Sequence, residues 1–198
     1  MVRWPVIAAL IGALTASISV VPAGHAQSVT ASPSASSLGT VVSPQAGGVF
    51  DITGGTRPSG GANLFHSFGN FSPDVGQTAR FVNQPSAPTD NILARVTGGN
   101  PSNIFGTINT LDYPGANLFL MNPAGIVFGP TARLDVAGSF HATTADYIKL
   151  SDGVRFGIDT PGAVLTAAPP AAFGFLSNNP ASIEVRTGGL EFDADGFP

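Results

Sequence analysis

The amino-acid sequence predicts an all-β chain wound into a parallel β-helix, and three observations lead to this fold class. Charged residues make up only 10% of the 198 residues, whereas glycine (25), proline (17) and phenylalanine (14) are frequent. A chain so poor in Lys, Glu and Arg lacks the residues that solvate the outer face of helices. The second observation is a strand and turn pattern over residues 115–138, and the third is the recurrence of its motifs along the chain.

Residues 115–138 contain three short strands with turn residues between them. The apolar runs Asn117–Met121 and Ile126–Phe128 flank Asn122–Gly125, where proline presets φ for a turn and glycine permits a positive φ. Arg133–Ala137 then alternates polar and apolar residues, which is the pattern of a strand with one solvated face. No helix-length apolar stripe separates these segments, so they are predicted to be consecutive strands.

Two short motifs recur without a strict period. The motif GANLF occurs at Gly61–Phe65 and again at Gly115–Phe119, each time at the start of an apolar strand. The motif TGG occurs at Thr53–Gly55, Thr97–Gly99 and Thr187–Gly189. Irregular self-similarity of this kind indicates a solenoid whose coils differ in length.

Further strands are expected where short apolar runs lie between turn residues. They are Thr40–Val42, Val49–Thr53, Leu64–Phe71, Thr78–Val82, Ile104–Asn109, Ser139–Thr143, Tyr147–Leu150, Val164–Thr166 and Ile183–Arg186. Asp90–Val96 is compatible with a short capped helix and equally with a strand. Gln27–Gly39 is rich in Ser, Ala and Pro and is interpreted as a flexible lead, so the β-helical domain is expected to span residues 40–198.

A β-sandwich is the alternative architecture. It predicts regularly spaced hairpin turns of the Asn-Gly or Asp-Gly kind, and only Asp152-Gly153 and Asp195-Gly196 qualify. In a parallel β-helix the stacked strands lie about 4.8 Å apart, inward Phe, Val, Ile and Leu form the core, and Gly and Asn occupy corners. A coil that stops at Pro198 would expose a strand edge, so the sequence is interpreted as a truncated part of a longer coil.

Residues 1–26 have the pattern of a secretory signal peptide. Arg3 precedes an apolar stretch over residues 6–21, and small residues at 24 and 26 suit cleavage between Ala26 and Gln27. The alternative is a single membrane anchor, but the apolar run is shorter than the roughly 18 residues expected of a span. The chain has no cysteine, so disulfide bonds do not contribute to its stability.

Composition and spacing argue against several classes of function. The net charge of −4 offers no basic surface for nucleic acid or anionic membranes. His66 and His141 have no metal-ligand spacing around them and are expected to be satisfied or surface histidines. The one close group of acids, Glu191, Asp193 and Asp195, is interpreted as a solvated tail. No catalytic residue, metal or cofactor is therefore predicted.

Three longer segments in order give the sequence a family resemblance. They are ITGGTRPSGGANLFHSFGNF at Ile52–Phe71, NILARVTGGNPSNIFGTI at Asn91–Ile108 and GANLFLMNPAGIVFGPTARLDVAGSFHATTADYI at Gly115–Ile148. With them the chain resembles the N-terminal two-partner secretion (TPS) domain of the filamentous-haemagglutinin type. The resemblance implies a right-handed parallel β-helix with a cap and extra-helical β-elements. It also implies a non-enzymatic secretion signal, which the POTRA domains of an outer-membrane partner transporter bind in an extended state.

The resemblance also supplies the candidate recognition residues. The family signature Asn-Pro-Asn-Gly-Ile maps onto residues 122–126, where Ala124 is the one departure, and the signature Asn-Pro-Asn-Leu has no literal counterpart. The residues implied to contact the transporter are Asn122, Pro123, Gly125, Ile126, Asn91, Ile92, Arg95, Val96, Thr97, Gly98, Pro101, Ser102 and Gly106. The alternative interpretation of residues 122–126 is a structural corner.

Two alternative functions come from other classes. A stand-alone surface adhesin or carbohydrate-binding β-helix would need a row of exposed aromatic residues, and the mature chain has only Tyr113 and Tyr147 beyond phenylalanine. A polysaccharide-active β-helix enzyme would need clustered carboxylates on adjacent coils, whereas the acids are scattered singly. Secretion recognition is therefore the favoured function.

Overall fold

The computed structural model describes residues 28–33 and 36–186, whose regular elements are β-strands and short 3-10 turns. The strands form four sheets, named here A to D. Sheet A contains β1 (Val29–Ala31), β4 (Asn63–Phe71), β6 (Asn91–Val96), β9 (Asn117–Met121) and β12 (Phe140–Thr143). Sheet B contains β2 (Thr40–Pro44), β3 (Val49–Gly54), β5 (Thr78–Phe81), β8 (Thr107–Asn109) and β11 (Arg133–Asp135). Sheet C contains β7 (Ser102–Ile104), β10 (Ile126–Phe128) and β16 (Ile183–Val185), and sheet D contains β13 (Tyr147–Leu150), β14 (Arg155–Gly157) and β15 (Pro170–Gly174).

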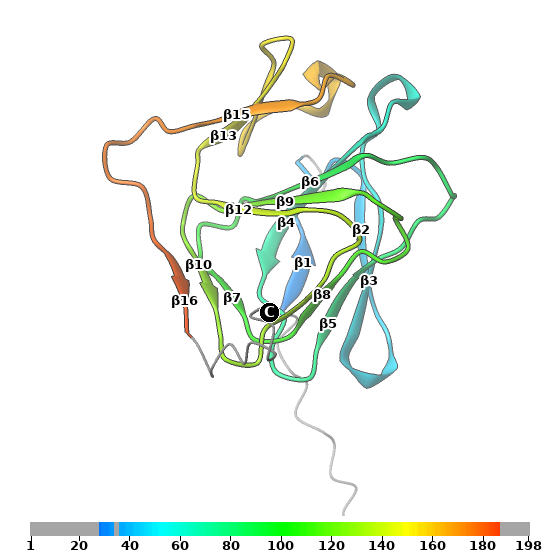
Figure 1. Cartoon of the computed structure of the whole chain (residues 1–198), viewed down its shortest axis with the longest axis vertical. Coiled ribbons are helices and arrows are strands. Elements are labelled where there is room, and N and C mark those ends of the chain that lie inside the picture. Colours follow the sequence, from blue (N-terminus) through cyan, green and yellow to red (C-terminus); the bar gives the residue numbers. More distant parts are fainter. Residues whose placement is uncertain (1–27, 34–35, 187–198) are drawn as a thin grey trace, which may run out of the picture.

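Sheets A, B and C form the three walls of a parallel β-helix, seen end-on in Figure 1. The chain passes from sheet B to A to C along β5, β6 and β7, and repeats this path along β8, β9 and β10. A third coil uses β11, β12 and finally β16. Successive strands pair in parallel within each wall. The predicted all-β solenoid is therefore confirmed.

Antiparallel strands close the N-terminal end of the coil. Strand β2 pairs with β3, and β1 pairs with β4. Val29 on β1 is fully buried and packs into the interior of the coil. The interpretation of residues 27–39 as a flexible lead is thus wrong for β1, because its apolar side chain and backbone groups complete the edge of sheet A.

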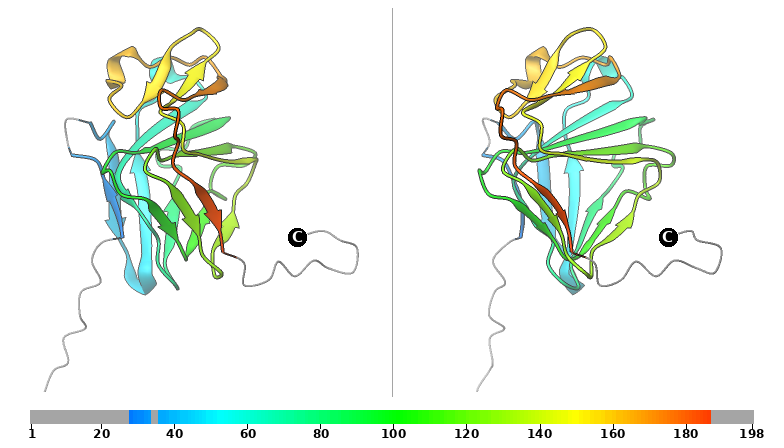
Figure 2. Two further views of the ribbon diagram at one scale, coloured as in Figure 1. Left: turned by 90° about the vertical axis from the view of Figure 1, so that its left-hand side faces the viewer. Right: turned by 60° about the vertical axis from the view of Figure 1, so that its left-hand side comes forward.

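Sheet D is an excursion from the third coil. It lies beside the outer face of sheet A, as the two views in Figure 2 show. Its Ile148 and Phe156 pack against Phe65 and Phe119 of sheet A. After the excursion the chain returns to sheet C, where β16 pairs with β10 in register, Ile183 beside Ile126.

Two hydrophobic cores result from this arrangement. One fills the coil and includes Phe68, Phe81, Ile92 and Ile108. The other lies between sheets A and D and includes Phe65, Leu93, Met121, Ile148, Leu150 and Phe156. Strand β6 is buried at all six positions because a core lies against each of its faces. This two-sided burial removes the alternation of a half-exposed strand, and it explains why the sequence of β6 was equally compatible with a helix.

Two strand predictions differ from the structure. Ile104–Asn109 is divided between β7 and β8, because the amides of Phe105 and Gly106 both donate to the carbonyl of Pro73 and form a corner. Val164–Thr166 is not a strand; the 3-10 turn Gly162–Val164 lies there instead. The other 3-10 turns are Ala46–Gly48 and Pro58–Gly60.

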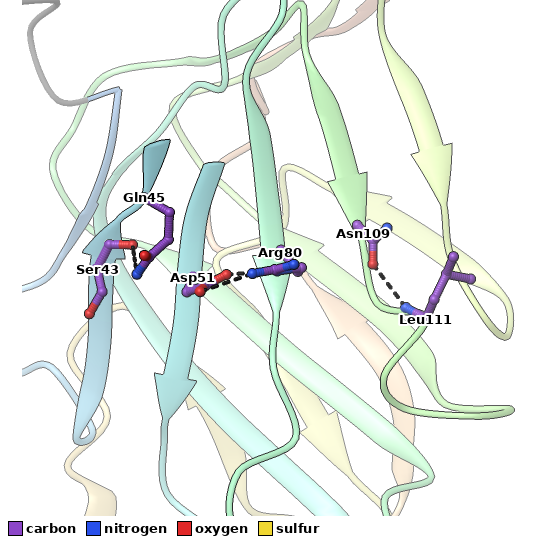
Figure 3. A network of polar contacts seen from close by, with 6 residues as sticks. All are labelled: Ser43, Gln45, Asp51, Arg80, Asn109 and Leu111. Carbon is purple, nitrogen blue, oxygen red and sulfur yellow. Dashed lines mark hydrogen bonds and ion pairs between the residues drawn. The ribbon is translucent and has the colours of Figure 1, made fainter. Parts of the chain in front are cut away.

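The outer face of sheet B is polar and solvated. Arg80 on β5 forms a bidentate ion pair with Asp51 on β3, at 2.7 and 3.0 Å, and Asn109 on β8 accepts a hydrogen bond from the amide of Leu111 (Figure 3). Within residues 28–33 and 36–186, no helix is long and apolar enough to cross a membrane.

Candidate functional site

The candidate recognition residues fall within two segments that lie on adjacent coils. Asn91–Gly106 contains β6 and β7, and Asn117–Phe128 contains β9 and β10. Strand β9 pairs with β6 in sheet A, and β10 pairs with β7 in sheet C. The corner at residues 97–101 therefore lies directly beside the corner at residues 122–125.

Asn122 joins these two corners. Its Nδ2 donates to the carbonyl of Asn100 at 3.0 Å and to Oγ of Ser102 at 2.9 Å. Its Oδ1 accepts a hydrogen bond from the amide of Ala124 at 2.9 Å. Asn122 is 1% exposed, and these hydrogen bonds satisfy its polar side-chain groups inside the protein.

The remainder of the 122–126 motif completes a tight turn. The amide of Gly125 donates to the carbonyl of Asn122 at 3.0 Å, and Gly125 has a φ of 119°, which favours glycine. Pro123 is partly buried, and Ile126 is buried in the core of the coil beside Ser102. The predicted turn is therefore confirmed, and in the folded state this motif is a structural corner.

Most of the other candidate residues are also inaccessible once the coil has formed. Ile92 and Val96 lie in the core, Asn91 and Ser102 are buried, Thr97 is partly buried, and Pro101 is exposed. A Cβ atom at Gly98 would lie 1.9 Å from the carbonyl oxygen of Gly69, and one at Gly106 would lie 2.3 Å from that of Gln77. Both glycines are required by the close approach of neighbouring coils.

Arg95 is the largest fully buried side chain among the described residues. Burial lowers the pKa of its guanidinium to about 10, so the group remains charged at neutral pH. Its side chain lies on the outer face of sheet A, on the side that sheet D covers, and it hydrogen-bonds to residues outside the two candidate segments.

An asparagine ladder at the opposite end of sheet A was not predicted. Asn117 Nδ2 donates to Asn91 Oδ1 at 3.1 Å, and Asn91 Nδ2 donates to Asn63 Oδ1 at 3.0 Å. The ladder ends at the carbonyl of Ala168 and at the amide of Ser139. The signal for it was present, because Asn63 and Asn117 hold the same place in the two GANLF motifs.

The two histidines have different surroundings. His141 stacks on Phe119 with ring centroids 4.4 Å apart. His66 is fully buried inside the coil, where Nδ1 lies 3.2 Å from Oγ1 of Thr40 and Nε2 has no hydrogen-bond partner among the described atoms. The expectation of a satisfied or surface histidine is therefore wrong for His66.

Several predicted features lie outside the described residues. They are the cleavage point at Ala26 and Gln27, the third TGG motif and the acidic group at residues 191–195. Within the described part of the chain, no three His, Cys, Asp or Glu side chains gather closely enough to hold a metal ion.

Comparison with known families identifies one match. The sequence profile of the TPS secretion domain matches residues 27–191. No curated protein and no solved structure matches the chain. The profile covers most of the chain and includes all four sheets and every candidate recognition residue.

Proposed function

This chain belongs to the family of TPS secretion domains, and from that premise we propose how it is recognised and exported. It is the β-helical secretion domain of a two-partner-secretion exoprotein. The POTRA domains of its outer-membrane transporter bind Asn91–Gly106 and Asn117–Phe128 while these segments are extended. The coil then forms at the cell surface. The observation that carries the function is the family match over residues 27–191.

The burial of the candidate residues supports recognition before folding. Asn122, Ile92, Val96 and Ile126 are accessible to a partner only in an extended chain, since the folded coil buries them. Apolar burial contributes roughly 25 cal/mol per Å² of surface removed from water. Formation of the two cores therefore opposes return of the chain through the transporter.

Export also requires passage across the inner membrane. We assign this step to residues 1–26 as a signal peptide, with cleavage between Ala26 and Gln27. The family match begins at residue 27, which supports this boundary. The protein acts without catalysis or a cofactor in this proposal, as is typical of TPS secretion domains.

A binding experiment with the unfolded chain tests recognition. The mature chain, residues 27–198, is diluted from urea into isolated POTRA domains of the partner transporter, and binding is followed alongside the far-ultraviolet β signal. We expect binding immediately after dilution and its loss as the coil forms. Binding by the folded chain that equals binding by the freshly diluted chain would contradict recognition in the extended state.

A second Asn-Pro pair provides a matched control. Replacing Asn122 and Pro123 with alanine is expected to weaken early binding at least about tenfold, equivalent to about 1.4 kcal/mol. Replacing Asn179 and Pro180, which are exposed in the loop before β16, should leave it unchanged. Equal effects of the two double substitutions would show that residues 122–123 have no specific role in recognition.

A further inference from the structure

Arg95 forms hydrogen bonds to three segments that are distant in sequence. Its Nε donates to Oγ of Ser67 on β4 at 2.9 Å. Its Nη1 donates to the carbonyls of Gly157 and, at 2.9 Å, Thr160, which lie in and just after β14 of sheet D. Its Nη2 donates to the carbonyl of Ser36 at 3.3 Å, in the segment between β1 and β2.

The guanidinium group also contacts sheet D through an aromatic ring. The Arg95 Cζ atom lies 5.2 Å from the ring centroid of Phe156, which is fully buried and in edge contact with Phe65. Such cation–π contacts are stronger when the cation is desolvated. The hydrogen bonds and the aromatic contact of Arg95 therefore both involve the C-terminal end of β14.

We propose that Arg95 is a clasp that holds sheet D and the loop at residues 157–162 against the outer face of sheet A. This role goes beyond secretion recognition, because it concerns the folded domain. An arginine suits it because its five N–H donors lie in a fixed planar fork that reaches several acceptors at once. A lysine ammonium is a point charge and cannot reach the acceptors on all three segments together.

A pocket beside Arg95 favours release of the loop at residues 157–162 once the contacts of Arg95 are lost. Arg95, Ser36, Asp159 and Thr160 line a pocket of ≈ 380 Å³, and Ile158, which also lines it, is 38% exposed. When the clasp opens, water in this pocket can hydrate the carbonyls that Arg95 leaves. Loss of Arg95 is therefore expected to free the loop while the coil remains folded.

The clasp also influences the last strand of the coil. Residues 144–182 lie between β12 and β16, and docking of sheet D brings residue 183 back to β10. When the loop is released, the ends of β12 and β16 are joined by a longer flexible connection, which lowers the stability of the β16 pairing. Release at residues 157–162 should therefore be accompanied by opening of β16.

Hydrogen exchange and limited proteolysis on the full mature chain test the clasp. For Arg95→Lys and Arg95→Gln we expect amide exchange over residues 155–165 to rise at least tenfold, with a smaller rise at β16 and none at β8 or β9. Thermolysin should cleave before Ile158 or Val164 in these variants faster than in the wild type. Arg155→Gln is the matched control, since Arg155 is exposed and lies over the Tyr147 ring within sheet D.

Two results would overturn the proposal. One is unchanged exchange over residues 155–165 in both Arg95 variants, and the other is an equal rise throughout the coil, which would indicate general destabilisation. Phe156→Leu provides a second approach if the Arg95 variants do not fold. It removes the ring below the guanidinium, and a rise over residues 155–165 with a smaller rise at β16 is expected, whereas no rise would contradict the clasp.

Discussion

His66 places a titratable ring in an apolar interior. It faces into the coil from β4, near the rings of Phe68 and Phe81, and only its Nδ1 has a hydrogen-bond partner. Burial, and to a lesser extent the positive charge of Arg57, lowers the pKa of His66 to about 3. The folded protein therefore holds this ring neutral, whereas the unfolded chain protonates it near its ordinary pKa of 6.5.

The depressed pKa of His66 predicts loss of stability in acid. Between pH 6.5 and about 3 the unfolded chain binds more protons at this ring than the folded protein does, so the free energy of unfolding falls as the pH is lowered. The expected slope is about 1.4 kcal/mol per pH unit below pH 6. Urea unfolding of the mature chain at pH 7 and pH 4.5 should therefore differ by roughly 2 to 3 kcal/mol through this residue.

Two substitutions separate His66 from other acid effects. His66→Phe removes the titrating group and fits its aromatic surroundings, so most of this pH dependence should disappear. His141→Gln is the control, because His141 lies outside the coil interior and stacks on Phe119. Retention of the full wild-type slope in His66→Phe would assign the acid sensitivity to carboxylates instead.

At the scale of elements, the corner after β6 depends on contact between two backbones. Gly98 leaves no room for a Cβ atom, which would lie 1.9 Å from the carbonyl oxygen of Gly69. Gly99 next to it has a φ of 78° but open space around its Cα. Glycine is therefore required at residue 98 for steric reasons and at residue 99 for its backbone conformation.

Alanine at these two glycines should have unequal effects. We expect Gly98→Ala to lower the free energy of unfolding by about 2 kcal/mol or more, because two backbone segments must separate. Gly99→Ala should cost about 1 to 2 kcal/mol from the left-handed backbone alone. Chemical denaturation of both variants measures the difference, and a larger loss for Gly99→Ala would mean that the coils can separate at this corner with little cost.

The strands that the sequence predicts best are those whose ends are defined by local turn chemistry. Asn117–Met121 and Ile126–Phe128 were predicted with the observed bounds because Pro123 and Gly125 mark the corner between them. The division of Ile104–Asn109 was not predictable in this way. Its corner depends on the carbonyl of Pro73, which approaches from the preceding coil.

In the candidate site, too, local sequence predicts the turn but not the contacts between coils. The turn at residues 122–125 follows from local residues, but its hydrogen bonds to Asn100 and Ser102 depend on how the coils stack. The contacts of Arg95 are harder still to predict, since its partners lie 28 to 65 residues away in sequence. A lone arginine within an apolar run gives no indication of which distant carbonyls it will meet.

For the whole molecule, two cores on opposite faces of sheet A predict two units of different stability. The core inside the coil holds three walls together, whereas the core under sheet D holds one excursion in place. Local opening generally follows such boundaries. The unit formed by sheet D should therefore open before the coil.

Two matched isoleucines test this order. Ile108 in the coil and Ile148 in sheet D are both fully buried, and Ile→Ala at either site is expected to cost about 2 to 5 kcal/mol locally. Ile108→Ala should accelerate hydrogen exchange in all three walls, whereas Ile148→Ala should accelerate it mainly over residues 144–182. The same exchange pattern in both variants would mean that the molecule opens as one cooperative unit.

The return of β16 to its place beside β10 has a consequence for protein engineering. The coil resumes in register after an excursion of residues 144–182, so its geometry is set by strand pairing and not by the number of intervening residues. Loop-closure entropy grows slowly, by about 0.6 kcal/mol for each doubling of length. The exposed loop at residues 175–180 is therefore a suitable place to graft a foreign peptide or a small domain for display on the β-helix.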